Sequence, residues 1–186
     1  MSHHPLPAQY LSILHAKREF ELAIMGKDPF PMDPIGIPFC KPDWDLQDDD
    51  LCSGHHVLAS LGVDMMAVRG VFAVPADYFQ YLANARGIVF LNLSYHFLDG
   101  PCRKGRHRAE LIQAATINNP VLSKSRRIIL CGEASKYRWY GDKPPHAHEV
   151  VHPDVRCRIS RFSNVADQWR EWWSVNAIAQ RFRVAV

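Results

Sequence analysis

The sequence lacks the features of several specialised protein classes. No apolar run approaches the roughly 20 residues that a membrane-spanning helix needs. The first seven residues are polar and contain proline, so they lack the apolar segment of a secretory signal peptide. The five cysteines are scattered and never spaced Cys-x-x-Cys, which argues against a disulfide framework, a zinc ribbon and an iron–sulfur cluster. These absences predict a protein of the reducing cytoplasm with no membrane contact.

The charge excess is also small, with a formal net charge of +3. Apolar residues make up 47% of the chain and charged residues 22%, a composition that supports a folded core and argues against disorder. A length of 186 residues predicts one domain over residues 1–186. Basic residues gather at 103–108, 124–127 and 156–161, and acidic residues at 43–50. This distribution is compatible with nucleic acid as a partner but does not establish it.

Short apolar runs alternate with amphipathic segments. The runs predict strands at 21–25, 87–94, 126–131 and 148–151. The amphipathic segments predict helices at 9–20, 55–61, 75–85, 108–117 and 164–173. The two central runs are almost continuously apolar, which is typical of strands buried on both faces. The alternation predicts an α/β fold, a three-layer sandwich in which helices flank a central, mostly parallel four-stranded sheet.

Polar and small residues follow each predicted strand. The segments that follow carry Asp28, Asn92, the small-residue turn after Gly132, and His152. Ligands of open α/β sheets bind beyond the carboxyl ends of the strands, where the loops converge. The sequence therefore predicts that a carboxylate, an amide, a small-residue turn and an imidazole meet at one edge of the sheet.

Several segments carry a family resemblance. Residues 26–31 read Gly-Lys-Asp-Pro-Phe-Pro and residues 36–40 read Gly-Ile-Pro-Phe-Cys, which resembles the uracil-DNA glycosylase motif Gly-Gln-Asp-Pro-Tyr-His followed by Gly-Leu-x-Phe. Residues 89–92, Val-Phe-Leu-Asn, are similar to the family's Leu-Leu-Leu-Asn strand. Residues 148–153 resemble the strand that leads into its His-Pro-Ser-Pro motif. The resemblance spans nearly the whole chain and implies an enzyme that removes uracil from DNA.

The resemblance assigns catalytic roles to Asp28 and His152. Glycosidic cleavage develops positive charge on the sugar and negative charge on the leaving base. Asp28 would position the attacking water and stabilise the cationic sugar, and His152 would donate to uracil O2. A donor aimed in advance at developing charge is worth roughly 3–4 kcal/mol. The structural alternatives are an Asp28 that caps the turn before Pro29 and a His152 satisfied at its strand end.

The resemblance also implies a base-binding set of Lys27, Phe30, Phe39 and Asn92. The Asn92 amide offers both a donor and an acceptor, so it can pair with uracil O4 and N3–H. Phe39 would stack on the flipped base, an interaction worth roughly 1–3 kcal/mol. The alternatives are a core phenylalanine and an asparagine that ends its strand by bonding its own turn.

The DNA-contacting residues implied by the resemblance lie in three segments. They are Ser53, the turn of Gly132, Glu133 and Ala134, and the arginines Arg156 and Arg158, with Arg161 beyond them. Backbone amides of the turn would hold phosphates, and the arginines would reach the DNA backbone. The alternative for Ser53 is a helix N-cap, and for the arginines a solvated basic surface.

Three positions depart from the family pattern. Phe30 replaces a tyrosine whose ring excludes thymine; phenylalanine keeps the ring and loses the hydroxyl. Pro31 replaces a histidine. Residues 152–158 differ from His-Pro-Ser-Pro-Leu-Ser, and counting places Arg156 where the family inserts a leucine into the vacated base stack. These changes indicate a divergent branch.

The leading hypothesis is a monomeric, monofunctional glycosylase that acts on uracil in single- or double-stranded DNA, releases free uracil and needs no metal or other cofactor. A second hypothesis is a DNA-binding module that keeps the fold without the chemistry. A third is a metal-dependent hydrolase, because His-His and His-x-His pairs can bind zinc. Its candidate ligands would be His55, His56, His146, His148 and His152.

Overall fold

The computed structural model describes residues 6–29, 35–101, 105–140 and 146–186, with residues 137–140 described by their backbone. The four apolar runs form the strands β1 (Leu22–Gly26), β2 (Ile88–Asn92), β3 (Ile128–Cys131) and β4 (Ala147–Val150). All pairings are parallel and the strand order is β2-β1-β3-β4. Strands β1, β2 and β3 are buried along their whole length, as their unbroken apolar composition predicts. The predicted α/β class and four-stranded parallel sheet are confirmed.

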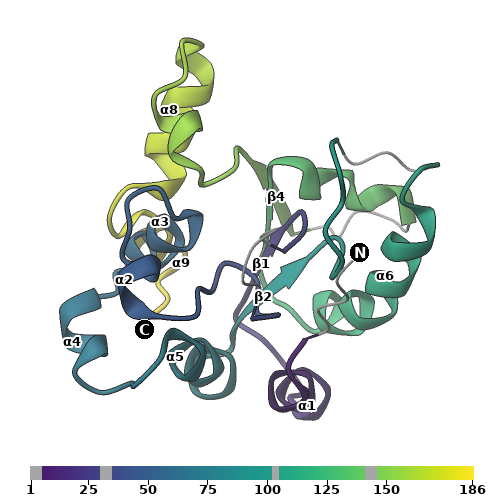
Figure 1. The fold of residues 1–186 in the computed structure, drawn as a ribbon, viewed down its shortest axis with the longest axis horizontal. Coiled ribbons are helices and arrows are strands. Elements are labelled where there is room, and N and C mark those ends of the chain that lie inside the picture. The colour runs from purple at the N-terminus through teal and green to yellow at the C-terminus, as the bar shows by residue number, and fades with distance from the viewer. Residues whose placement is uncertain (1–5, 30–34, 102–104, 141–145) are drawn as a thin grey trace.

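One helix precedes the first strand, and the others fill the connections between the strands or follow the last one. They are α1 (Ala8–Ala16), α2 (Trp44–Gln47), α3 (Ser53–Ser60), α4 (Met65–Arg69), α5 (Pro75–Tyr81) continued by a π-helical turn (Leu82–Arg86), α6 (Arg108–Ser123), a 3-10 segment (Gly132–Tyr140), α7 (Val155–Arg158), α8 (Ser163–Trp173) and α9 (Ala177–Phe182). Figure 1 shows α6 on one side of the strands and α2, α3 and α9 on the other. Within the described residues, no helix combines the length and apolar character needed to cross a bilayer.

One helix stands apart from the rest. Figure 1 shows α8 projecting away from the body of the molecule, with its first turn at the far end. The base of α8 is anchored by two indole groups: Trp169 Nε1 donates to the carbonyl of Pro153 over 3.2 Å, and Trp173 Nε1 donates to that of Val151 over 2.9 Å. The segment that follows β4 is therefore tied to α8 on its way out of the sheet.

Two predicted helices have different ends in the structure. The helix predicted at 9–20 ends at Ala16, because Lys17 is extended and Phe20 pairs with Ser125 in an isolated bridge beside the sheet. The helix predicted at 108–117 continues to Ser123 through Pro120. Its added turn carries Asn118, whose amide donates to the carbonyl of Asn92 over 2.8 Å and accepts from the Tyr95 hydroxyl over 2.7 Å. Tertiary hydrogen bonds thus extend a helix that local sequence signals would end earlier.

Candidate functional site

A cleft of about 640 Å³ opens at the carboxyl ends of the strands. Each strand supplies part of its wall, directly or through the residues that follow it: Gly26 to Pro29 after β1, Asn92 at the end of β2, Gly132 and Glu133 after β3, and His152 after β4. The rest of the described lining comes from residues 35–40, Ser53, Phe97, Asp154, Arg156 and Cys157. Parallel strands end at one edge of the sheet, which is why segments so distant in the chain meet here.

Asp28 is held from one side and open on the other. Its Oδ2 accepts a 2.8 Å hydrogen bond from the backbone N–H of Leu98, whereas Oδ1 makes no hydrogen bond to any described residue. The side chain is 12% exposed, and this burial raises its pKa above the usual aspartate value; the Leu98 N–H and the Lys27 ammonium act in the opposite direction. One oxygen is therefore fixed, and the other is available to orient a water molecule.

Lys27 lies beside Asp28 and fixes the loop opposite it. Its Nζ donates to the carbonyls of Gly100 (2.8 Å) and Leu98 (3.3 Å), and it lies 3.4 Å from Asp28 Oδ2 and 3.8 Å from Glu133 Oε2. One ammonium thus joins segments that follow β1, β2 and β3. The contacts indicate that Lys27 organises the cleft wall, and direct contact with a base stays a prediction.

Gly26, Phe39 and Asn92 pack against one another in the lining of the cleft, and we call this part of the lining the base slot. A Cβ atom placed on Gly26 would lie 2.8 Å from Asn92 Oδ1 and 3.0 Å from Phe39 Cζ, so both side chains pack over the bare glycine. Asn92 is 3% exposed, and its side-chain amide has no hydrogen-bond partner among the residues that the structure describes. The Asn92 amide is not among the fully buried, unpartnered polar atoms of the described residues, so it stays accessible from the cleft and offers a donor and an acceptor to a ligand there.

His152 presents one ring nitrogen to the cleft. Its Nδ1 accepts a 3.2 Å hydrogen bond from the backbone N–H of Asp154, which assigns the proton of the neutral ring to Nε2. Burial lowers its pKa below the usual histidine value, so the ring is neutral near pH 7. Gly132 has a φ of +54°, and a Cβ there would lie 3.2 Å from His152 Cβ. A glycine therefore admits the imidazole at this position.

Asp154 connects His152 to the rim of the cleft. Its carboxylate accepts from the Arg156 backbone N–H (2.8 Å) and from the Arg156 guanidinium at both oxygens (2.8 and 2.6 Å). The first contact caps α7, and the arginine keeps the Asp154 pKa below its usual value. The Arg156 side chain is 84% exposed and lies at the rim, so its guanidinium is partly committed to Asp154 while remaining open to solvent.

Some of the other residues predicted to contact the base or DNA line the cleft, and others lie outside it. Ser53 and Glu133 line the cleft, and Ser53 is the first residue of α3, whose N-cap is Cys52 rather than Ser53. Ala134 is fully buried, so contact with DNA there would fall to its backbone. Arg158 lies outside the cleft lining, bound to both carboxylate oxygens of Asp50 (3.0 and 2.6 Å). Phe30 and Pro31 lie outside the described residues.

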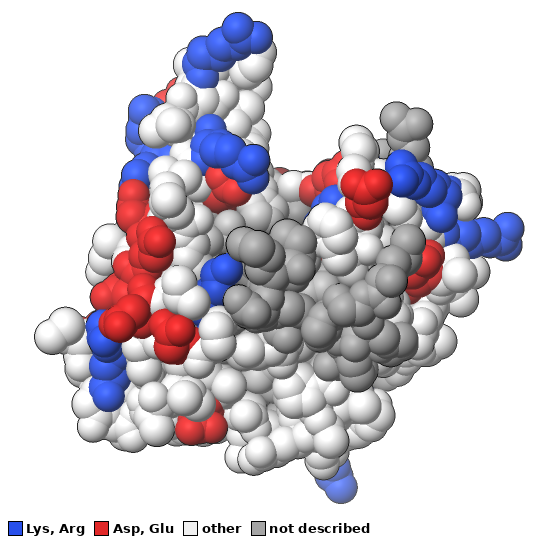
Figure 2. Space-filling view, in the orientation of Figure 1, with Lys and Arg blue, Asp and Glu red and all other residues white. Residues whose placement is uncertain are grey.

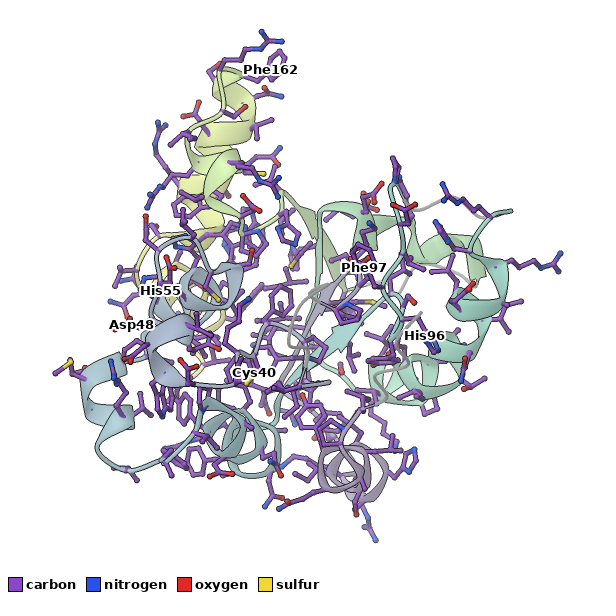
Figure 3. The ribbon with its side chains drawn as sticks, viewed as in Figure 1. Cys40, Asp48, His55, His96, Phe97 and Phe162 are labelled. Carbon is purple, nitrogen blue, oxygen red and sulfur yellow. The ribbon has the colours of Figure 1, made fainter. Side chains whose placement is uncertain are left out.

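Sequence reasoning missed three contributors. Phe97, labelled in Figure 3, lines the cleft with 41% of its surface exposed. It precedes Leu98, whose backbone N–H donates to Asp28. No local pattern singled it out. Gly26 carried a signal, because it stands inside the segment 26–31, and Asp154 lies in the segment 152–158 that departs from the family pattern, but neither residue was assigned a role.

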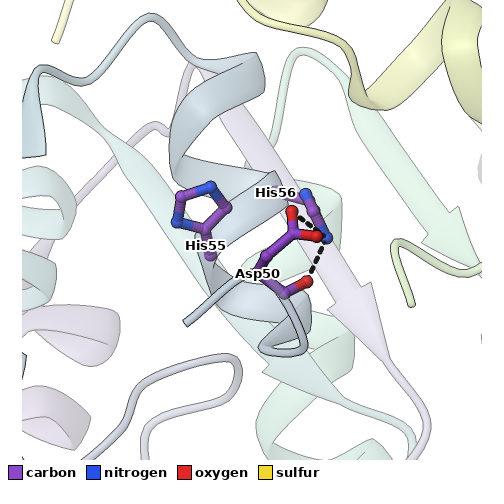
Figure 4. Close-up of side chains that lie close together, drawn as sticks. All are labelled: Asp50, His55 and His56. Atoms are coloured by element: carbon purple, nitrogen blue, oxygen red, sulfur yellow. Dashed lines mark hydrogen bonds and ion pairs between the residues drawn. The ribbon is translucent and has the colours of Figure 1, made fainter. Parts of the chain in front are cut away.

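The five histidines of the metal hypothesis, all of them described, do not form one metal centre. Within the described residues, the single group that brings three potential ligand atoms within 4.8 Å of one another is Asp50, His55 and His56 (Figure 4). The Asp50 carboxylate is occupied by Arg158, and His56 Nε2 lies 2.8 Å from the Asp50 carbonyl oxygen. Asp50 and His56 are therefore partnered, whereas His55 Nδ1 makes no hydrogen bond within the described residues, and the contact of Asp50 with Arg158 joins the cluster to α7.

The remaining metal candidates lie elsewhere. His148 packs against the rings of Trp172 and Phe182, each at 5.3 Å between centroids, and His152 belongs to the cleft. The five histidines of the metal hypothesis therefore share no centre in the described part of the chain.

Charge is unevenly spread over the face seen in Figure 2. Acidic side chains gather over α2 and α3, whereas basic side chains cover the far end of α8. At that end Arg161 lies over the ring of Phe162, 5.1 Å from its centroid, and Phe162 and Ile159 are 58% and 73% exposed. A polyanion that covered the cleft would find favourable charge on the α8 side and unfavourable charge over α2.

Comparison with known proteins gives a distant likeness in fold. No family model matches the sequence, and no curated protein matches it. A similar solved structure is the wild-type UNG, a uracil-DNA glycosylase, from Nitratifractor salsuginis. The two are 14% identical with a TM-score of 0.47, and the match covers 78% of this chain and 70% of the other. A likeness at this level carries no assignment of function, which has to rest on the geometry of the cleft.

Proposed function

We propose that this chain is a DNA glycosylase that hydrolyses the N-glycosidic bond of uracil flipped out of DNA and leaves an abasic site. The observation that carries the proposal is the convergence of Asp28, Phe39, Asn92 and His152 on one cleft, from segments spread over more than 120 residues of the chain. Each supplies a different part of what base removal needs: a carboxylate, a flat apolar surface, an amide and an imidazole N–H.

The slot suits a flat base with two polar edges. Phe39 offers a ring against which a base can stack, and the Asn92 amide in the cleft lining can donate to one base oxygen and accept from a neighbouring N–H. Uracil presents O4 beside N3–H and matches this pair. Cytosine presents an amino group beside an unprotonated ring nitrogen, so it would be mispaired with an Asn92 amide that keeps the orientation suited to uracil.

His152 and Asp28 act on opposite charges of the transition state. The His152 Nε2–H would donate to O2 of the leaving base, and the neutral ring suits this role because it stabilises the uracil anion without transferring a proton. The Asp28 carboxylate would stabilise the cationic sugar and would orient the attacking water through Oδ1, which makes no hydrogen bond to a described residue. Removal of either charge interaction would slow the bond-breaking step.

DNA would lie across the rim of the cleft, with Arg156 facing a phosphate. Because the Arg156 guanidinium already pairs with Asp154, a phosphate contact is better supported than insertion of this side chain into the base stack. The amides of the turn at Gly132 and Glu133 would meet a second phosphate. Within the proposal the protein acts as a monomer in the cytoplasm and needs no metal.

The test is release of uracil from a labelled oligonucleotide in the presence of a chelator, with Asp28→Asn beside the native protein. Loss of a positioned carboxylate should lower the single-turnover rate by about 10²–10⁴-fold. Asp167→Asn is the matched control, since Asp167 is exposed and pairs with Arg170 on α8. DNA binding without base release by the native protein would contradict the proposal and favour a binding module.

A further inference from the structure

Phe39 has a strained backbone. Its φ is +65°, in the left-handed region that side chains other than glycine rarely occupy. Such a conformation persists where the surrounding structure holds it, and it is found at ligand-binding positions. Phe39 lines the cleft, so the question is which residues hold its backbone in place.

The side chain of Gln47 bridges the two sides of this turn. Its Nε2 donates to the Phe39 carbonyl (3.4 Å), and its Oε1 accepts from the Lys41 backbone N–H (2.8 Å). Gln47 lies in α2 and is completely buried, yet it is not among the residues that line the cleft. A single amide therefore fixes peptide groups on both sides of Cys40, one residue beyond the strained position.

Gly54 closes the turn from the other side. A Cβ atom there would lie 1.8 Å from the Phe39 carbonyl oxygen and 2.5 Å from Gln47 Nε2. The start of α3 is thus pressed directly against the carbonyl that Gln47 binds, which no residue larger than glycine would allow. The carbonyl of Phe39 is held between an amide donor and a packed helix.

The position of the Phe39 ring depends on that carbonyl. The ring lies over Gly26, with Cζ 3.0 Å from the site of a Cβ there, and meets Phe90 edge-on at 6.4 Å between centroids. Relaxation of φ to a negative value would rotate the Cα–Cβ bond and carry the ring away from Gly26 and Asn92. The base slot therefore exists only while the backbone at residue 39 stays in the left-handed region.

We propose that Gln47 is a positioning residue for Phe39, which builds the aromatic wall of the slot before any base enters. The effect of this wall on base release rests on the proposed glycosylase function. The pair of hydrogen bonds by which Gln47 holds the backbone at Phe39, which we call the latch, does not depend on that function. In a site preorganised in this way, the conformational entropy of the ring is lost when the protein folds and not when the base binds.

A double-mutant cycle tests the latch. Gln47→Met keeps the length of the side chain and removes both hydrogen-bonding groups, and it should lower kcat/KM for uracil release by about tenfold or more. In a Phe39→Leu background the same change should have no further effect on kcat/KM, while its effect on Tm persists. Equal losses of activity in both backgrounds, or no loss in the native background, would overturn the proposal.

A matched control separates positioning from general destabilisation. Ser60→Ala removes a fully buried side-chain hydrogen bond, Oγ to the Val57 carbonyl, on the neighbouring helix α3. It should lower Tm and leave kcat/KM unchanged. If Gln47→Met does not fold, Gln47→Glu takes its place in the cycle, because it keeps an acceptor for Lys41 and removes the amide donor to Phe39.

A crystal structure of the Gln47→Met variant tests the latch independently of any base-release activity. The expected result is a Phe39 φ that has become negative and a ring displaced from Gly26. A Phe39 that keeps its φ and its place over Gly26 would refute the latch. If the native protein releases no base, the proposed function fails by itself, and this structural measurement still decides whether Gln47 positions Phe39.

Discussion

Gly26→Ala is the sharpest test of the base slot, because it adds one methyl group at a known place. Gly26 ends β1 and pairs in register with Asn92 of the adjacent strand. The new Cβ would lie 2.8 Å from Asn92 Oδ1 and 3.0 Å from Phe39 Cζ. Both neighbours are groups that the proposal assigns to the base, so the methyl group would occupy the space beneath it.

The magnitude follows from the contact distances. Carbon atoms pack at about 3.5–4.0 Å, so the Phe39 ring must retreat by roughly 0.5–1 Å and the Asn92 amide must turn aside. A displacement of about 1 Å in a positioning group can cost roughly 10²-fold in rate. The cost in stability should stay within about 1–3 kcal/mol, as is usual for one added methyl group in a packed region. Activity should therefore fall far more than stability.

The assay is single-turnover release of uracil, accompanied by thermal unfolding of the same samples. Gly105→Ala is the control, since a Cβ at Gly105 meets no atom of the described residues within 4 Å. A Gly26→Ala protein that keeps its release rate within about threefold of the native one would refute the slot. A protein that loses its fold along with its activity would refute the claim that the two are separable here.

Three further results are expected. Asp28→Asn should raise Tm at pH 7 while it slows base release. The reason is that the buried carboxylate, whose pKa is raised, destabilises the fold when it is ionised. Thermal unfolding measured across pH checks this, and a lower Tm at pH 7 would contradict it. The release rate should fall on acidification at a higher pH than for an ordinary aspartate, since Asp28 must be ionised to act and burial raises its pKa. The lowered pKa of His152 stabilises the fold at neutral pH, and this stabilisation is lost as the pH falls from the unfolded to the folded pKa of that histidine. A rate profile that is flat to below about pH 4 would argue against the role of Asp28. Arg156→Gln should weaken DNA binding and reduce the slope of log affinity against log salt by about 1, with little change in rate at saturating DNA, whereas an unchanged slope would place Arg156 away from phosphates.

Much of the fold could be predicted from local sequence. The buried strands stand out because a strand covered on both faces is apolar at every position, as in residues 88–91 and 128–131. The short helices α2, α4, α7 and α9 could not be predicted in this way. Helices of four to six residues are too short to show a periodic pattern, and their stability comes from contacts such as the Trp44 indole on the Phe72 carbonyl.

The sequence by itself determined which chemical groups follow each strand. Because the carboxyl ends of parallel strands lie at one edge of the sheet, it also indicated that these groups meet there. Only the tertiary structure decided how those groups are held. The Leu98 amide fixes one oxygen of Asp28, the Asp154 amide selects the tautomer of His152, and Gln47 holds Phe39 in a strained backbone conformation. Leu98 lies 70 residues from Asp28, Asp154 two residues from His152, and Gln47 eight residues from Phe39. Only the first contact could be expected from the order of the strands, because Asp28 and Leu98 follow neighbouring strands of the sheet. Hydrogen-bond geometry and close packing depend on fractions of an ångström, and residue order alone does not specify distances at that scale.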